Sequence, residues 1–141
     1  MWIKTHSITV SNLEPEQVWK VWSNINDRPK WDIDLKWAKS DSPFQKGAII
    51  QMQPEGGPKI RLEITECIPN QLFTDCYQFP LGLAKLYGIH HMEKTAEGLC
   101  LTTSIKVEGP LGWILRKLIG EKVVAEIPQQ TEMLVALART K

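Results

Sequence analysis

The sequence carries few residues of the kinds that mark metal-binding, redox or secreted proteins. Its 141 residues include only three cysteines, Cys67, Cys76 and Cys100, and no two of them form a Cys-x-x-Cys pair. An odd number of cysteines without that spacing argues against a disulfide framework and favours free thiols in a reducing compartment. We therefore expect a cytoplasmic protein.

Long apolar runs and an excess of either charge are also missing. No stretch approaches the roughly 20 apolar residues that cross a bilayer, and the opening MWIKTHSITV lacks the apolar segment of a signal peptide. Lys and Arg number 17 against 16 Asp and Glu, without a basic stripe, so we expect no nucleic-acid partner. With 43% apolar and 23% charged residues, the chain is typical of one globular domain over residues 1–141.

In the first third of the chain, the spacing of apolar residues changes once, from the alternation of a strand to the period of a helix. Residues 1–10 alternate between two faces, which predicts a strand. LEPEQVWKVWSNI then takes a helical period, and Pro15 suits the first turn because its missing N–H would be unpaired there. Residues 26–31 contain Asp27 and Pro29 and predict a tight turn or a single helical turn.

From Asp32 to Val107 the pattern predicts consecutive short strands. Breaks fall at SDSPFQKG, PEGGP, IPNQ, FPLGL and TAEG, where turn-forming residues gather. Strands with such short connections form an antiparallel meander. One face is the more apolar, and on it we place Ile60, Leu62, Ile64, Phe73, Tyr77, Phe79, Leu86, His90, Met92, Leu101, Ile105 and Val107.

The last part of the chain predicts one long helix. From Leu111 to Ala138 apolar residues recur at helical spacing, and Pro128 inside this stretch should bend the helix. The expected fold class is α+β. A curved antiparallel sheet of about six or seven strands wraps around the C-terminal helix, and two short helices follow the first strand.

Four pieces of sequence, in this order and spacing, resemble the START-like (SRPBCC) superfamily and its polyketide cyclase/dehydrase and lipid-transport group. They are PEQVWKVWSNINDRPKWD, SPFQKGAI, ITECIPNQLF and VEGPLGWILRKLIG, and the similarity covers nearly the whole chain. The resemblance implies a helix-grip fold with a deep, mostly apolar cavity between the sheet and the last helix. It does not imply one reaction, because such a fold hosts many functions.

The stretch KLYGIHHMEK places two histidines side by side. Neighbours on a regular strand point to opposite faces, so His90 and His91 cannot chelate one metal together, and we expect neither a metal nor a cofactor. His90 shares the parity of Leu86 and Met92, which predicts a buried, cavity-facing His90 and a solvent-exposed His91. Gly88 should leave room beside His90 for a ligand, whereas a β-bulge there would exchange the two roles.

Two interpretations of the role of His90 remain open. It is either a core histidine satisfied by a neighbouring strand, or a neutral pocket residue that bonds a ligand oxygen or moves a proton. Tyr77 is the second candidate for acid/base chemistry, whereas Asp75 is expected at a strand end or bonded to a backbone N–H. The predicted cavity has roughly 300 Å³ or more and is lined by Trp31, Leu62, Ile64, Phe73, Tyr77, Leu86, His90, Met92, Leu101, Thr103, Ile105, Ile119 and Val123.

Three classes of function remain. The first is a carrier or sensor of a small hydrophobic molecule, such as a lipid or polyketide. The second is a polyketide cyclase/dehydrase-type enzyme in which His90 or Tyr77 acts as acid or base. The third is an interaction module similar to the Hsp90-activator branch of the superfamily.

The sequence also bears on membrane contact and on self-association. One interpretation of the segment with Trp113, Leu115, Arg116, Lys117 and Leu118 is an interfacial membrane helix. Glu121 and Glu126 on the same helix favour a covering helix with a solvated outer face, so we expect no stable membrane insertion. A homodimer, formed through the first strand or the outer face of the sheet, stays open.

Overall fold

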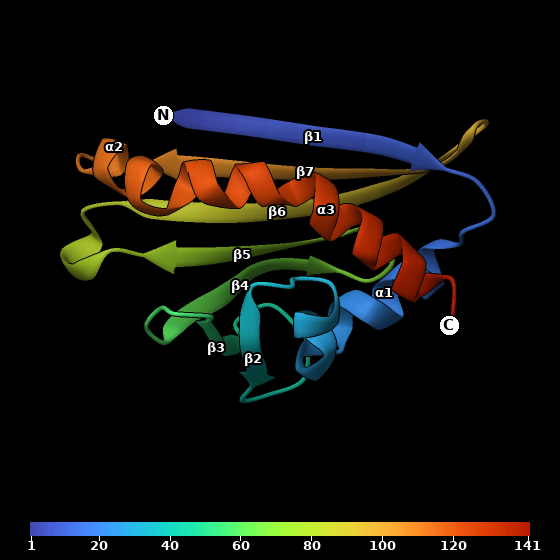
Figure 1. The fold of residues 1–141 in the computed structure, drawn as a ribbon, viewed down its shortest axis with the longest axis horizontal. Coiled ribbons are helices and arrows are strands. Elements are labelled where there is room, and N and C mark those ends of the chain that lie inside the picture. The colour runs from blue at the N-terminus through green and yellow to red at the C-terminus, as the bar shows by residue number, and fades with distance from the viewer.

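The computed structural model describes residues 1–141 as a seven-stranded antiparallel sheet and a long C-terminal helix (Figure 1). The strands are β1 (Trp2–Val10), β2 (Leu35–Ser40), β3 (Ile49–Pro54), β4 (Ile60–Ile68), β5 (Leu72–Gln78), β6 (Lys85–Thr95) and β7 (Gly98–Glu108). Two short helices follow β1, namely α1 (Pro15–Ser23) and η1 (Ile25–Lys30), and the turn η2 (Pro80–Gly82) joins β5 to β6. The C-terminal helix consists of α2 (Gly112–Leu115), η3 (Arg116–Gly120) and α3 (Glu121–Ala138).

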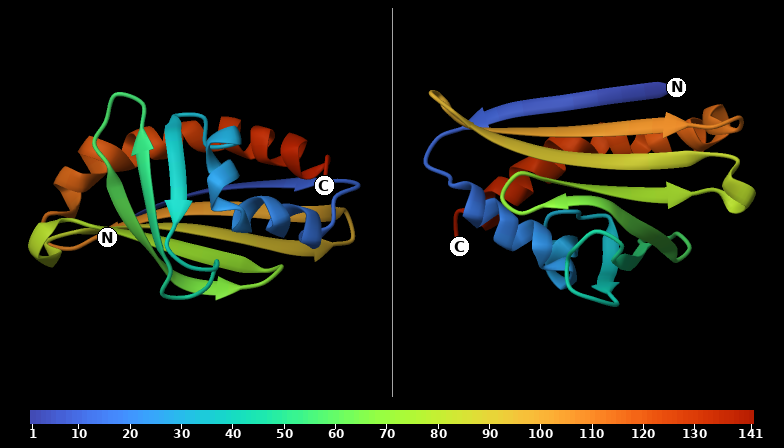
Figure 2. Two further views of the ribbon diagram at one scale, coloured as in Figure 1. Left: turned by 90° about the horizontal axis from the view of Figure 1, so that it is seen from below. Right: turned by 180° about the vertical axis from the view of Figure 1, so that it is seen from behind.

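The sheet follows the predicted meander. Its strand order is β1-β7-β6-β5-β4-β3-β2, so each strand from β2 to β7 pairs with its neighbour in sequence, and β1 closes the far edge against β7. Figure 2 shows the sheet curving around the C-terminal helix, with α1 at one end of the concave side. The predicted fold class is therefore confirmed.

The C-terminal helix is continuous but not regular. Figure 1 shows it running along β6 and β7 and then changing direction within α3, the element that contains Pro128. Proline has no N–H to donate to the carbonyl four residues earlier, which is the cause expected for such a bend. The π-helical turn η3 was not predicted, because no residue pattern signals it. None of the helices combines the length and apolar character needed to cross a membrane.

The core is divided into two clusters. The larger lies between α1, η1, the end of α3 and the sheet, and contains Trp22, Trp31 and Phe73 among its 19 buried residues. The smaller lies under the first half of the C-terminal helix and consists of Ala84, Leu86, Ile105, Val107, Leu115 and Ile127. Tyr77 on β5 packs against both clusters and marks the boundary between them.

Candidate functional site

Strand β6 places the two histidines on opposite faces. Burial alternates strictly from Lys85 to Met92, and the register with β5 and β7 is regular at Gly88, so no bulge interrupts the strand. His90 is buried with 7% of its surface exposed, which confirms the predicted parity. His91 lies on the outer face but is half-buried, and is therefore less exposed than predicted.

His90 is surrounded by aromatic rings. Its imidazole stacks on Phe73, with ring centroids 4.3 Å apart, and the rings of Trp22 and Trp31 meet it edge-on at 6.0 and 6.2 Å. Burial lowers the pKa of His90 to about 4, although the charge of Asp75 opposes that shift. The imidazole is therefore neutral at pH 7.

A buried ion network lies beside His90 and was not predicted. Asp75 is in the middle of β5 with 4% of its surface exposed, and its carboxylate accepts a hydrogen bond from Arg28 Nη1 at 3.2 Å. Arg28 also pairs through Nε with Asp32 at 3.4 Å, and the other carboxylate oxygen of Asp32 accepts a bond from Gln130 at 3.1 Å. The expectation of Asp75 at a strand end or on a backbone N–H is thus wrong, because Arg28 neutralises it inside the core.

The space beside Gly88 is occupied by this network. A Cβ atom built on Gly88 would lie 2.6 Å from Asp75 Oδ1 and 3.5 Å from His90 Nε2. The expectation that Gly88 leaves room for a ligand is therefore wrong, since the missing side chain makes room for the Asp75 carboxylate.

The side chains expected to line a large cavity leave very little space. The small inner pocket measures about 10 Å³, which is room for about one water molecule, and is lined by Trp31, His90, Thr103, Ile127, Gln130, Thr131 and Leu134. Three of the expected residues, Trp31, His90 and Thr103, therefore line it. The larger core cluster contains five others, Leu62, Ile64, Phe73, Met92 and Leu101. The smaller cluster contains Leu86 and Ile105, and Ile119 and Val123 pack against it. Instead of enclosing the expected cavity of roughly 300 Å³, most of these side chains pack against one another in the two core clusters.

The two indole groups that contact His90 each have a hydrogen-bond donor without an acceptor, and one of them, Trp31, lines this pocket. Nε1 of Trp22 and Nε1 of Trp31 are buried and have no acceptor within the protein. An unpaired buried donor costs about 1–3 kcal/mol. A guest at this position would be limited to a very small molecule with an oxygen acceptor.

A much larger space opens where β4 and β5 separate. Their ladder runs from Ile68–Leu72 to Glu63–Cys76 and then stops, and Figure 1 shows the strands diverging toward η2. The cleft at this point has a volume of about 640 Å³. Its lining combines residues from both faces of the sheet with η2, and consists of Lys59, Ile60, Arg61, Leu62, Glu63, Thr65, Cys76, Tyr77, Gln78, Phe79, Pro80, Leu81, Gly82, Lys85 and Tyr87.

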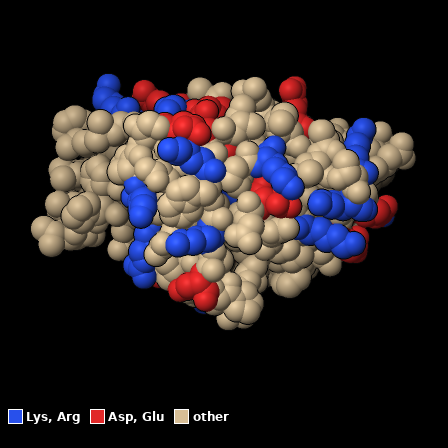
Figure 3. All heavy atoms as spheres, turned by 60° about the horizontal axis from the view of Figure 1, so that its bottom comes forward, with Lys and Arg blue, Asp and Glu red and all other residues tan.

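The cleft is amphipathic and carries an excess of positive charge. Leu62, Tyr77 and Phe79 provide apolar surface that reaches the core, and Lys59, Arg61 and Lys85 provide three cationic groups. Glu63 is the only acidic residue in the lining, and none of the three basic side chains forms an ion pair. Figure 3, which brings the β2–β4 side forward, shows Lys and Arg side chains spread over that face.

Only part of this cleft was visible in the sequence. Leu62 and Tyr77 belong to the predicted cavity, whereas no sequence pattern singles out the outward-facing residues of the cleft, such as Arg61. The separation of two strands within a continuous sheet has no local sequence signal, so the cleft was missed. No group of three His, Cys, Asp or Glu side chains is placed to hold a metal ion.

Comparisons with known proteins identify the fold. No family model and no curated protein matches the chain. Among solved structures, MLL2253 from Mesorhizobium loti is similar at a TM-score of 0.74 and 17% identity, covering 99% of this chain and 98% of its own. The di-domain ARO/CYC StfQ from the steffimycin biosynthetic pathway is similar at a TM-score of 0.75 and 14% identity, and the match covers 98% of this chain and 50% of StfQ.

A third solved structure has the same overall fold. Ara h 8.0201 is similar at a TM-score of 0.68 and 12% identity, covering 99% of this chain and all of its own. Similarity at this level of identity shows the fold alone. The chain shares its helix-grip fold with these structures, and this is the fold that the sequence resemblance implied.

Proposed function

We propose that this protein binds a small hydrophobic molecule with an acidic head group, as a carrier or sensor, in the cleft between β4 and β5. The observation that carries the proposal is the contrast between two spaces. The cleft offers about 640 Å³, within the range of ligand sites, whereas the small inner pocket offers about 10 Å³.

The lining of the cleft supports this class of ligand. An apolar body would contact Leu62, Tyr77 and Phe79, and burial of its surface supplies most of the affinity. A carboxylate would be held by Arg61 and Lys85, which have no competing carboxylate partner. The ligand class is therefore narrower than the hydrophobic molecule expected from sequence.

An enzyme of the cyclase type is the second candidate, favoured by the similarity in fold to StfQ, which is described as an ARO/CYC protein. Its weak point is His90, which lines only the pocket of about 10 Å³. Tyr77, which lines the cleft, is the better candidate for acid or base. A His90→Phe variant distinguishes the roles, because a carrier retains binding whereas a cyclase that uses His90 loses turnover.

Isothermal titration with decanoate and with uncharged decanol tests the proposed function. Decanoate should bind more tightly than decanol, and an Arg61→Gln/Lys85→Gln variant should weaken decanoate binding by about tenfold while leaving decanol unchanged. Lys4→Gln on the distant edge strand β1 is the matched control and should change neither. Absence of decanoate binding, or equal binding by the double variant, would contradict the proposal.

A further inference from the structure

One end of the molecule exposes three large apolar side chains from two separate segments. Leu81 of η2 is 93% exposed, and Trp113 of α2 and Leu118 of η3 are 62% and 66% exposed. The two segments are tied together by a hydrogen bond from Leu111 N–H to Leu83 O at 2.9 Å. Figure 1 shows both at the same end of the sheet, and we call Leu81, Trp113 and Leu118 the apolar tip.

The backbone of Leu81 is strained in a way that presents its side chain to solvent. Its φ of 63° lies in the left-handed region, which only two other non-glycine residues adopt, Asn12 and Asn70. Asparagine tolerates that region, but for leucine it costs on the order of 1 kcal/mol. An unfavourable conformation that leaves a leucine 93% exposed gives no benefit to folding, which points to a role outside the isolated chain.

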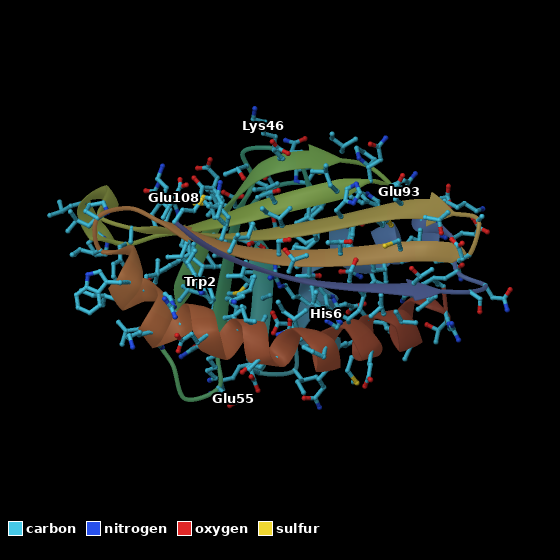
Figure 4. All side chains as sticks on the ribbon, turned by 90° about the horizontal axis from the view of Figure 1, so that it is seen from above. Trp2, His6, Lys46, Glu55, Glu93 and Glu108 are labelled. Carbon is cyan, nitrogen blue, oxygen red and sulfur yellow. The ribbon has the colours of Figure 1, made fainter.

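The segments that carry the tip contain basic but no acidic residues, and Glu108 and Glu121 adjoin the second segment at its two ends. Segments 79–85 and 109–120 contain no Asp or Glu, and they contribute Lys85, Arg116 and Lys117. Lys85 and Lys117 form no ion pair, whereas Arg116 contacts Glu121 at 3.2 Å and lies over the Trp2 ring at 5.4 Å. Figure 3 shows uncharged atoms covering this end, at the left of the view, and Figure 4 shows side chains projecting from the same end.

We propose that the apolar tip docks this protein on the surface of a membrane that carries anionic lipids. Leucine and tryptophan side chains that project singly suit the boundary between head groups and acyl chains, where the amphipathic indole is favoured. The neighbouring lysines match the negative charge of such a surface. The docking is peripheral, since the helix also buries Leu115 in the core and stays part of the fold.

This inference does not depend on the proposed ligand, although η2 forms part of the cleft rim as well. The helix thus combines the covering role that the sequence favours with exposed apolar side chains of the kind found on an interfacial helix. Leu115 faces the core, as in a covering helix, and Trp113 and Leu118 face outward, as in an interfacial one.

Sedimentation with vesicles tests the docking. The wild type should sediment with vesicles of phosphatidylcholine mixed with phosphatidylglycerol, and much less with phosphatidylcholine alone. Leu118→Glu should weaken this binding by about tenfold or more, because one large apolar side chain loses its burial and a negative charge is added. Met133→Glu is the matched control, since Met133 is also exposed on the C-terminal helix but lies outside the tip.

A second variant separates docking from folding. Leu81→Gly removes the apolar side chain and suits the positive φ, so it should fold as stably as the wild type but bind the anionic vesicles more weakly. The proposal is overturned if the wild type ignores anionic vesicles, binds neutral ones equally well, or is unaffected by Leu118→Glu. A dimer that tip variants dissociate in analytical ultracentrifugation would also overturn it, by showing that a second copy covers the tip.

Discussion

At the scale of single residues, burial determines the chemistry of His90. The imidazole is enclosed by Phe73, Trp22 and Trp31, and the carboxylate of Asp75, the nearest charge that would favour protonation, is already paired with Arg28. The cost of desolvating an imidazolium therefore outweighs the attraction to Asp75, and the pKa falls to about 4. His90 is a neutral core residue at pH 7.

The first prediction concerns the pH dependence of stability. The pKa of His90 is about 4 in the folded protein and about 6.5 in the unfolded chain, so the unfolded state takes up a proton first as the pH falls. The free energy of unfolding is therefore highest above pH 6.5 and decreases as the pH falls toward 4. The loss should reach roughly 3 kcal/mol in the free energy of unfolding. Urea unfolding of wild type and His90→Phe across this range measures it as the difference between the two proteins.

The same prediction has a direct spectroscopic check. The imidazole resonances of His90 should stay those of the neutral ring from pH 8 down to 5 in carbon–proton NMR spectra. Titration of His90 with a midpoint near 6.5 would show that the ring is solvated, contrary to the burial described here.

The second prediction concerns Gly88. A Gly88→Ala variant places a methyl group 2.6 Å from Asp75 Oδ1, and the short Asp75 side chain cannot move without disturbing its bond to Arg28. We expect a loss of about 1–3 kcal/mol in the free energy of unfolding. Gly112→Ala is the matched control, because its new methyl group would meet Val107 at an ordinary 3.4 Å. Equal stability of the two variants would contradict the account of Gly88.

At the scale of elements, the ion network joins three parts of the fold that are distant in sequence. Arg28 of η1 bonds Asp75 of β5, and Asp32, just after η1, bonds Gln130 of α3. These contacts fix η1 between the sheet and the C-terminal helix and help to close the space where a large cavity was expected. A buried charge pair of this kind is sensitive to the loss of one partner.

The third prediction follows from that network. Arg28→Met should lower the free energy of unfolding by about 3–5 kcal/mol, because it leaves the carboxylate of Asp75 buried without a partner. Adding Asp75→Asn should recover part of this loss. Lys30→Met is the control, since the Lys30–Asp27 pair is exposed on its lysine side and should contribute less than about 1 kcal/mol. A similar effect of both single variants would mean that Arg28 is not acting through buried charge.

Local sequence patterns predicted the elements but not their distant contacts. Strand alternation placed His90 inside, and turn residues marked the meander. The Arg28–Asp75 pair joins residues 47 positions apart, and nothing in the residues near Asp75 identifies its partner. The packed interior depends on how large side chains such as Trp31 and Phe73 fit together. The cleft depends on where β4 separates from β5. The alternation of apolar and polar residues along one strand predicts neither.

At the scale of the whole molecule, the helix-grip fold places its accessible space outside the core. The inner pocket beside His90 holds about 10 Å³, and the cleft at the β4–β5 divergence holds about 640 Å³. The cleft rim and the apolar tip meet at Leu81, so a ligand site and a docking surface would lie at the same end of the protein. The fold fixes this arrangement, whereas the chemistry of the proposed ligand would depend on Lys59, Arg61 and Lys85.

The central claim is that ligands bind in the β4–β5 cleft while the interior stays closed. Titration of the isotope-labelled protein with decanoate, followed by nitrogen–proton NMR, tests it residue by residue. Our account predicts shifts concentrated at Arg61, Thr65, Cys76 and Tyr87, with little change at the inner-pocket residues Thr103 and Thr131. Shifts concentrated instead at Thr103 and Thr131, with the cleft unaffected, would contradict it.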